Sequence, residues 1–393
     1  MLKLAVIGFG RRTDCVIREI YNYLDGNLEI SGVLDPYEPG VNELLKSYGL
    51  TTKFYPDVES LMKNSNADGV VVGTRCNLHT PYAIALEKYN VPIFLEKPVS
   101  LNMEDALSLE KAYKNSKTKV VVSFPLRVSP VCEYVKTRIE SGAIGKPNDI
   151  LAVNYVPYGR VYFEDFYRYY NEYQGLLLQK ATHDLDYIEY LMGSPIKSIA
   201  ATGSFGNIMG GKKLAGLTCE KCDEIFSCKE SHISRRNFQI KNNLPSHLCP
   251  FSVDCGNPEE GMNEDSSSVI FEFENGARGV YTQVFYVTNR AGKRGATISG
   301  YDGTLEFDWY TSKVKYYGHH QDIVESVAIS SGDSHFAGDF SLARNFIDVI
   351  RGKEESKTPL SVGLSSVYSC LAAKESLKTK KFEQVKQVGN IAK

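Results

Sequence analysis

The first indication of the fold is one segment near the start of the chain, Leu2-Lys3-Leu4-Ala5-Val6-Ile7-Gly8-Phe9-Gly10-Arg11-Arg12-Thr13. Its apolar first half favours a buried strand, and the two glycines allow a tight turn and a close approach of the backbone to phosphate. A helix beginning at this turn would present free amides to a pyrophosphate. Glycines can also simply end a strand, but the order strand, turn, helix favours a dinucleotide site. Thr13 replaces the usual small third residue, so we expect the helix to lie slightly outward. The candidate cofactor-binding residues of the turn are Gly8, Phe9, Gly10, Arg11 and Arg12.

Four more short apolar runs follow within residues 1–125, separated by helical patterns. Consecutive Val, Ile and Leu residues are typical of parallel strands covered on both faces. The alternation predicts an α/β Rossmann domain with a doubly wound parallel sheet. The five runs are Leu2–Ile7, Ile30–Leu34, Gly69–Val72, Ile93–Leu95 and Val120–Ser123.

Asp35 ends the second predicted strand, where a carboxylate can bind the adenosine ribose hydroxyls and repel a 2′-phosphate. Pro36 and Tyr37 follow and offer no cation for such a phosphate. The sequence therefore favours NAD over NADP, although a strand-end Asp can also just cap a turn.

Residues 126–393 carry longer strand-like segments joined by turn signals, such as Glu274-Asn275-Gly276. We expect an α+β domain with a large, mostly antiparallel sheet. The stretch at about 206–264 has no periodicity and is predicted to be a cysteine-rich insertion. Predicted strands cover 149–156, 196–204, 267–274, 277–287, 295–300 and 304–309, and predicted helices cover 131–141, 182–192, 338–351 and 363–377.

The composition narrows the classes of function. The 393 residues include 45 Lys and Arg against 47 Asp and Glu, so no basic excess indicates nucleic acid as a partner. Hydrophobic residues make up 42% of the chain, as in ordinary globular proteins, and no apolar run approaches the roughly 20 residues of a membrane helix. The first strand starts at Leu2, which leaves no room for a signal peptide, so we expect a cytoplasmic protein.

Two segments carry candidate catalytic groups. Glu96-Lys97-Pro98 ends the fourth predicted strand, at the sheet edge where ligands bind, so Lys97 is placed to face a nicotinamide. His183 and Asp186 are three residues apart and share a helix face. A neutral imidazole could take a hydroxyl proton as hydride leaves the carbon, and Lys97 could donate to the resulting carbonyl oxygen. A strand-end charge pair and a histidine that satisfies a buried helix end are the simpler interpretations.

Together these motifs make the sequence resemble the Gfo/Idh/MocA family of oxidoreductases. The resemblance rests on Gly8-Phe9-Gly10, Thr74-Arg75-Cys76-Asn77-Leu78-His79, Glu96-Lys97-Pro98, the stretch from Arg127 to Pro130, Gly142-Ala143-Ile144-Gly145, and His183 with Asp186. It implies a Rossmann domain over residues 1–125 and a C-terminal sheet domain over residues 126–393 that binds substrate and mediates oligomers. It also implies hydride transfer between nicotinamide and a carbohydrate or cyclitol hydroxyl.

The resemblance also implies roles for single residues. Thr74, Asn77 and His79 would line the cofactor pocket, and Glu96 and Lys97 would lie beside the nicotinamide ribose and the substrate. Arg127 is a candidate for both ligands. A cis Lys97–Pro98 bond is expected, as in the family.

One departure concerns the substrate side. Many family members carry Asp four residues before this histidine, and here the residue is Gln179. The next residue, Lys180, is predicted to bind an anionic or densely hydroxylated substrate. The aromatic residues of 155–173 could stack on sugars or form a subunit interface. The remaining substrate-binding candidates are Lys97, Arg127, Tyr155, Arg168, His183, Asp186 and His335.

Five cysteines gather in the insertion: Cys219, Cys222, Cys228, Cys249 and Cys255. A Cys-x-x-Cys pair can bind one ion from a single turn, so a structural zinc is predicted, with an iron–sulfur cluster less favoured. Free thiols or a disulfide would also fit the same residues, and five candidates for four positions leave the ligand set open.

The sequence thus predicts an NAD(H)-dependent oxidoreductase, a homo-oligomer (dimer or tetramer), acting on a hydroxyl carbon of a sugar, sugar derivative, glycoside or cyclitol. Two rival functions fit the same motifs. One is an NAD-dependent glycosidase that oxidises the sugar transiently and eliminates the aglycone, and the second is a catalytically silent NAD-sensing module.

Overall fold

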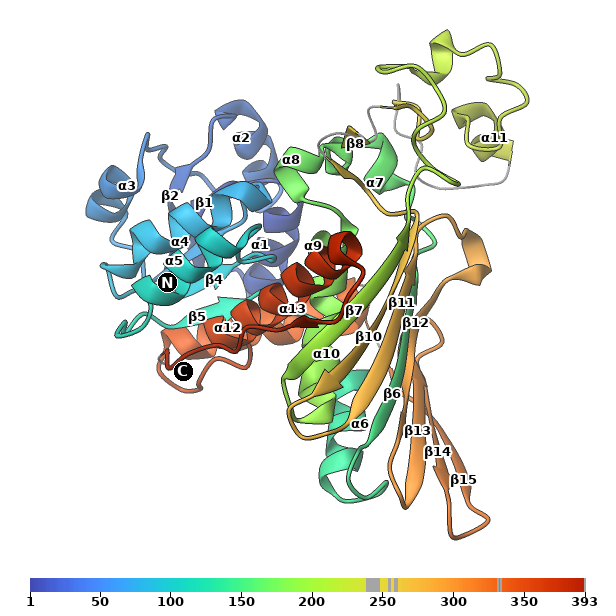
Figure 1. Ribbon diagram of the computed structural model, residues 1–393. Coiled ribbons are helices and arrows are strands. Elements are labelled where there is room, and N and C mark those ends of the chain that lie inside the picture. The colour runs from blue at the N-terminus through green and yellow to red at the C-terminus, as the bar shows by residue number, and fades with distance from the viewer. Residues whose placement is uncertain (238–247, 254–255, 258–260, 331, 333, 392–393) are drawn as a thin grey trace.

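The computed structural model describes residues 1–237, 248–253, 256–257, 261–330, 332 and 334–391. Two β-sheets dominate it, with helices between them (Figure 1). The mixed α/β class predicted from the sequence is confirmed, with a parallel sheet in the first part of the chain and a large, mostly antiparallel one in the second.

The first sheet has five parallel strands in the order β2-β1-β3-β4-β5. Every residue of β3, β4 and β5 is buried, because helices cover both faces of the sheet. The strands are β1 (Leu2–Ile7), β2 (Leu28–Leu34), β3 (Gly69–Val72), β4 (Ile93–Leu95) and β5 (Val120–Val122). The helices are α1 (Arg11–Tyr23), α2 (Glu38–Lys46), α3 (Val58–Ser65), α4 (His79–Glu87) and α5 (Met103–Ala112), with the 3₁₀ turn η1 (Cys76–Leu78).

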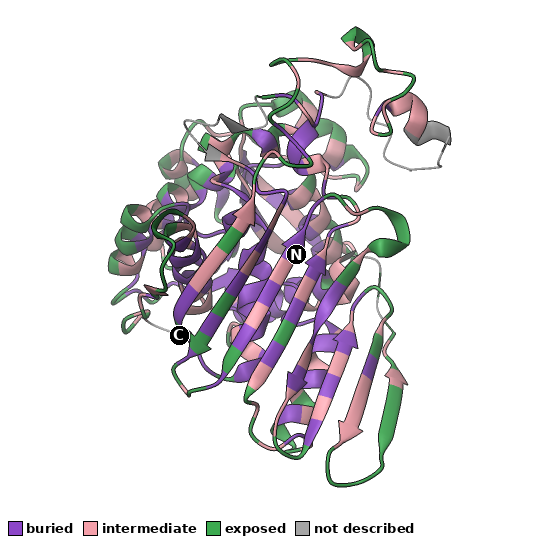
Figure 2. Ribbon diagram, turned by 45° about the vertical axis from the view of Figure 1, so that its right-hand side comes forward, coloured by how far each residue is buried: buried purple, intermediate pink, exposed green. Residues whose placement is uncertain are grey.

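The second sheet has nine strands in the order β15-β14-β13-β12-β6-β11-β10-β7-β16. Only β6 and β11 run parallel to each other, and the other neighbours are antiparallel. Burial alternates along its strands, as Figure 2 shows, because one face packs on helices. The strands are β6 (Asp149–Tyr155), β7 (Ile196–Ser204), β10 (Ser266–Phe273), β11 (Arg278–Val284), β12 (Lys293–Ser299), β13 (Gly303–Asp308), β14 (Lys313–Gly318), β15 (Val324–Ala328) and β16 (Glu383–Gln384).

Helices of the second half join the two sheets. α10 and α13 contribute Leu185, Ile188 and Val367 to one apolar core that also contains residues of both sheets, such as Val122 and Phe271. The long helices are α6 (Pro130–Glu140), α10 (Ala181–Met192), α12 (Gly338–Ile350) and α13 (Leu360–Thr379). Short helical segments are α7 (Val161–Glu164), η2 (Phe166–Arg168), α8 (Tyr170–Tyr173), α9 (Leu176–Gln179), η4 (Asn289–Ala291) and η5 (Ser334–Ala337).

Helix α12 returns to the first sheet although it lies late in the chain. It packs on α1, and Phe346 meets Phe94 of β4 edge-on, with ring centroids 5.6 Å apart. The predicted division at residue 125 therefore separates α12 in sequence from the core that it completes.

The segment between β7 and β10 projects from the end of the second sheet (Figure 1). Its described residues form only short elements: η3 (Cys219–Lys221), α11 (His232–Asn237), β8 (Gly256–Asn257) and β9 (Gly261–Met262).

Candidate active site

The turn between β1 and α1 leaves no room for side chains. Gly8 has a φ of +79°, and a Cβ there would lie 2.7 Å from the backbone of Thr74. Gly10 caps α1 without a side-chain hydrogen bond, so the first amides of the helix are not used by a cap. This is the geometry that a pyrophosphate needs at a helix N-terminus.

Thr13 is accommodated rather than excluded. Its buried hydroxyl donates to the carbonyl oxygen of Gly8 at 2.7 Å. A Cβ on Gly73 would lie 2.0 Å from the same hydroxyl. The glycine at the end of β3 thus supplies the space that the usual third small residue would have provided.

Asp35 lies beside this turn, at the end of β2. One carboxylate oxygen accepts a hydrogen bond from the amide of Phe9 at 2.7 Å, and the other accepts one from the amide of Tyr37 at 2.8 Å. The carboxylate is thereby fixed at the edge of the predicted cofactor site. Arg11, at the start of α1, is exposed.

Thr74, Asn77 and His79 have different positions. Thr74 packs on Gly8, and Asn77 is exposed on η1. His79 is buried, with its ring nitrogens 2.8 Å from the carbonyl oxygen of Pro98 and 3.1 Å from that of Thr74. His79 therefore ties the end of β3 to the segment after β4, where the Lys97–Pro98 bond is cis.

Lys97 follows β4 and points toward the second half of the chain, where its ammonium donates to the carbonyl oxygen of Gln179 at 2.7 Å. Burial lowers the pKa of Lys97 to about 8. The charges of Lys180 and Arg12 act in the same direction, whereas Cys76 and Glu96 oppose them. Lys97 can therefore exchange a proton close to neutral pH.

Arg12 does not stay in the glycine turn. Its guanidinium donates to Glu96 at 2.8 Å and forms a two-pronged pair with Asp339 of α12 at 2.6 and 2.9 Å. His335 shares the same carboxylate at 2.7 Å. These charges hold the pKa of Asp339 well below its usual range despite burial, which opposes them. Arg12 thus links the cofactor turn to α12, and nothing in the sequence around Asp339 indicates this partner.

His183 lies in the first turn of α10 and is 4% exposed. Its Nδ1 atom is buried and has no hydrogen-bond partner among the described residues. The ring centroid lies 5.9 Å from that of His335 and 6.0 Å from that of Phe124. Burial lowers the pKa of His183 well below its ordinary value, and the surrounding positive charges, that of Lys97 first, act in the same direction.

His335 is presented by an unusual turn. His335, Phe336 and Ala337 have φ values of +41°, +57° and +66°, and none is glycine. Consecutive left-handed residues are costly for L-amino acids, by about 1–2 kcal/mol each. The turn is followed by Gly338, where a Cβ would lie 1.9 Å from the carbonyl oxygen of Pro125. Strain of this kind is often found at functional sites.

Lys180 directly precedes α10 and is 4% exposed. Its ammonium donates to the hydroxyl of Tyr158 at 2.7 Å and lies 5.0 Å from the centre of that ring and 5.9 Å from that of Tyr162. The carboxylate of Glu264 accepts hydrogen bonds from the first amides of α9, which fixes the segment that leads into Lys180.

Other predicted site residues are engaged elsewhere. Arg127 and Asp186 form a buried ion pair at 2.6 Å. Arg168 is fully buried and donates to Ser252, in the segment between β7 and β10. Tyr155 ends β6, in register with Lys293 of β12. Whether any of these positions touches substrate stays a prediction.

Two residues that act on this cluster, Arg294 and Tyr158, are not predicted by any sequence motif. Arg294 of β12 is buried and pairs with Asp184 of α10 through two hydrogen bonds of 2.9 Å. Tyr158 belongs to the aromatic stretch 155–173, and its hydroxyl accepts the hydrogen bond from Lys180. Neither lies in a motif, because strand pairing in the second sheet brings Arg294 to the site.

The cysteine prediction gains no support. Cys219, Cys222 and Cys228 are free thiols, Cys249 is buried, and Cys255 lies outside the described residues. No group of three or more His, Cys, Asp or Glu side chains within the described ranges is arranged to hold a metal ion.

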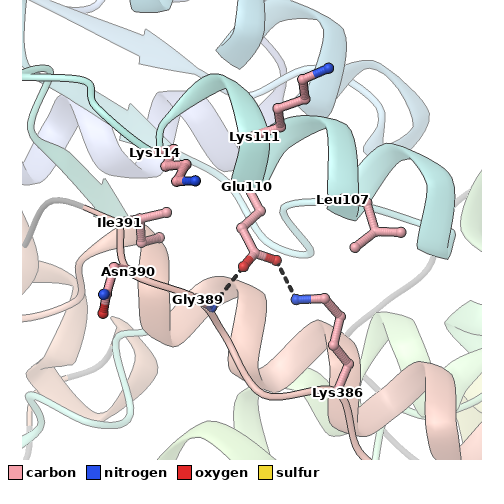
Figure 3. Close-up of a pocket in the computed structure, with 8 residues that line it drawn as sticks. All are labelled: Leu107, Glu110, Lys111, Lys114, Lys386, Gly389, Asn390 and Ile391. Carbon is pink, nitrogen blue, oxygen red and sulfur yellow. Dashed lines mark hydrogen bonds and ion pairs between the residues drawn. The ribbon is translucent and has the colours of Figure 1, made fainter.

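A cavity of about 430 Å³ lies apart from these residues, between α5 and the segment after β16 (Figure 3). Glu110 of α5 accepts hydrogen bonds from the ammonium of Lys386 and the amide of Gly389, both at 2.6 Å. The cavity shares no lining residue with the cluster around Lys97, and its contacts fasten the C-terminal segment to the first domain.

No helix in the described part of the chain is both long and apolar enough to cross a membrane.

Comparison with known proteins identifies two family models. Residues 2–124 match the model described as an oxidoreductase family with an NAD-binding Rossmann fold, and residues 132–306 match the GFO/IDH/MocA C-terminal domain.

Individual relatives are distant. The myo-inositol 2-dehydrogenase of Thermotoga maritima is 28% identical over 52% of this chain. The match spans only 58% of that enzyme's length. YteT of Bacillus subtilis, described as an oxidoreductase, is 22% identical over 95% of this chain and 96% of its own length. A levoglucosan dehydrogenase solved with NADH superposes with a TM-score of 0.78 at 16% identity, covering 98% of this chain and all of the other.

Proposed function

Since the chain belongs to the Gfo/Idh/MocA family of oxidoreductases, we propose that it is an NAD-dependent dehydrogenase that oxidises a hydroxyl carbon of a sugar or cyclitol. The named relatives support this class of substrate, because they include inositol dehydrogenases and a levoglucosan dehydrogenase. The observation that carries the proposal is the position of Lys97, which has a lowered pKa and lies in the same charge cluster as a buried histidine with an unpartnered nitrogen.

The residues at the β1–α1 turn fit NAD. The space at Gly8, the uncapped start of α1 and the fixed carboxylate of Asp35 suit pyrophosphate and an adenosine ribose with a free 2′-hydroxyl. When bound, the nicotinamide supplies the hydride acceptor. Glu96 is held by Arg12 at the end of β4, next in sequence to Lys97.

The proton of the substrate hydroxyl would pass to Lys97. An amine with a pKa of about 8 is partly neutral near physiological pH and can accept that proton, while its ammonium form can return it in the reverse direction. We assign His183 a second hydrogen bond to the same hydroxyl rather than the role of base that its sequence suggested. Burial and the positive charges around it lower the pKa of His183, which disfavours its protonated form.

A panel of sugars and cyclitols with NAD and with NADP, followed at 340 nm, tests the proposal. We expect NADH formation with at least one hydroxylated substrate and a clear preference for NAD. Analysis of the products for a released aglycone tests the glycosidase function, which gains no specific support from the relatives. Absence of turnover with every substrate would count against the dehydrogenase and favour a silent NAD-binding module.

A further inference from the structure

The cationic groups of the candidate active site differ in whether an acid balances them. Arg12 is paired with Glu96 and Asp339, and Arg294 is paired with Asp184. The carboxylates of Glu96, Asp339 and Asp184 are therefore already paired with the two arginines.

The two lysines have no such partner. Among the described residues, neither Lys97 nor Lys180 has a carboxylate within ion-pairing distance. The ammonium of Lys97 donates to the carbonyl oxygen of Gln179, and that of Lys180 donates to the hydroxyl of Tyr158. Each lysine contributes to the positive field that lowers the pKa of His183.

The residue at position 179 supplies no negative charge to offset the two lysines. Gln179 directly precedes Lys180, and its backbone carbonyl oxygen accepts the hydrogen bond from Lys97. The Gln179 side chain is neutral, and its carbonyl oxygen lies 3.4 Å from the thiol of Cys76, which donates to it. The site therefore keeps two buried or half-buried ammonium groups in a region where an unbalanced charge is costly.

Two further groups, the Tyr158 hydroxyl and the His183 ring, also indicate that this region suits an anionic or polar ligand. Burial opposes ionisation of the Tyr158 hydroxyl, yet the charges of Lys180 and Arg294 lower its pKa below the ordinary value. The Nδ1 atom of His183 is buried without a partner among the described residues. The first observation indicates a field that favours a negative charge, and the second indicates a polar position that a ligand would fill.

We propose that the substrate is an anionic sugar or cyclitol, carrying a carboxylate or a phosphate, and that Lys180 binds this group while Lys97 and His183 face the reacting hydroxyl. The inference rests on the proposed function, since it names the substrate class of that same site. The oxidised nicotinamide is itself cationic, so an anionic substrate also offsets the charge that the cofactor brings. The compact, point-like charge of a lysine suits either anion.

The experiment compares acidic substrates with their neutral parents. The probes are galacturonate with galactose, glucuronate with glucose, glucose 6-phosphate with glucose, and inositol 1-phosphate with myo-inositol, each at low ionic strength with NAD. The carboxylate and phosphate pairs separate the two kinds of anion. We expect kcat/KM for at least one acid to exceed that of its parent by on the order of 10- to 100-fold, the range of one charge-assisted hydrogen bond.

Three variants connect the preference to Lys180. Lys180→Gln should remove it while NAD binding is retained, and Lys180→Arg should keep most of it. The matched control is Lys374→Gln, since Lys374 also lies over a tyrosine ring, that of Tyr170 at 5.1 Å, but on α13 with Gln174 as its partner. The control should leave the ratio of acid to parent unchanged.

Equal rates for acid and parent in every pair, or a preference that persists in Lys180→Gln, would overturn the inference and leave the dehydrogenase standing. If no pair yields NADH, calorimetric binding to the NAD-loaded enzyme decides. Acids that bind more tightly than their parents, and only when Lys180 is present, would support the anion site although the proposed reaction fails. Acids that bind no more tightly than their parents would overturn it.

Discussion

The cofactor turn between β1 and α1 and the cluster of charged side chains around Lys97 are built in opposite ways. The turn uses backbone: two glycines, uncapped amides and a carboxylate held by the amides of Phe9 and Tyr37. The cluster uses charged side chains removed from water, with Lys97 and His183 both shifted in pKa. The geometry that binds the cofactor is therefore local in sequence, whereas the reactivity of the site arises only where distant segments meet.

Replacing Lys97 should separate the two regions most strongly. Lys97→Ala removes the proposed proton acceptor but none of the turn, so turnover should fall on the order of 10²-fold or more while NAD binding is largely kept. Steady-state kinetics together with NAD titration by fluorescence measure both quantities.

The exposed Lys63→Ala serves as a control and should be silent. His183→Ala should also lower turnover, and the double variant should lose less than the product of the two, because both side chains act on one hydroxyl. Near-wild-type turnover of Lys97→Ala on the identified substrate would show the proposed mechanism to be wrong even though the fold is right.

Replacing Asp35 should affect the opposite region. Asp35→Ser removes the group that repels a 2′-phosphate, so the ratio of kcat/KM for NAD to that for NADP should fall by about tenfold, with turnover under saturating cofactor little changed. Asp25→Ser, at an exposed turn residue, is the comparison. An unchanged cofactor preference would remove Asp35 from the ribose site.

The smallest expected effect is a shift in the pH dependence of kcat/KM. Oxidation should speed up as pH rises through about 8, because Lys97 accepts the proton only when neutral. The positive charge of Lys180 favours neutral Lys97, so Lys180→Gln should raise the pKa of Lys97 and move the inflection of kcat/KM upward by roughly half a unit. A downward shift would contradict the assignment of the inflection to Lys97.

The first sheet could be predicted almost residue by residue. Buried parallel strands are short apolar runs, and the five runs match β1 to β5 within two residues at each end. The second sheet was harder, since β14 and the edge strand β15 contain Lys313, Lys315 and Glu325 and so lack a clear apolar pattern. The parallel pairing of β6 with β11 could not be inferred from sequence, because it depends on which strands meet in space.

The candidate site follows the same division. Gly8, Asp35 and Lys97 stand at strand ends that a pattern can locate. Arg12 has the position of a cofactor residue in sequence, yet its guanidinium bonds to Asp339, 327 residues away. The lowered pKa of Lys97 likewise depends on its burial by segments that belong to no local motif. Properties that depend on the removal of a side chain from water, such as the pKa of Lys97, could therefore not be predicted from sequence motifs.

The late position of α12 has a consequence for how the chain is made. Phe346 and Ile347 cover apolar side chains of the first sheet and α1, including Ile17 and Val71. During translation, the nucleotide-binding half emerges first but lacks this cover until residues 338–350 have been synthesised. The nascent protein thus exposes this apolar surface until α12 follows, and the packing of its nucleotide-binding half is completed only then.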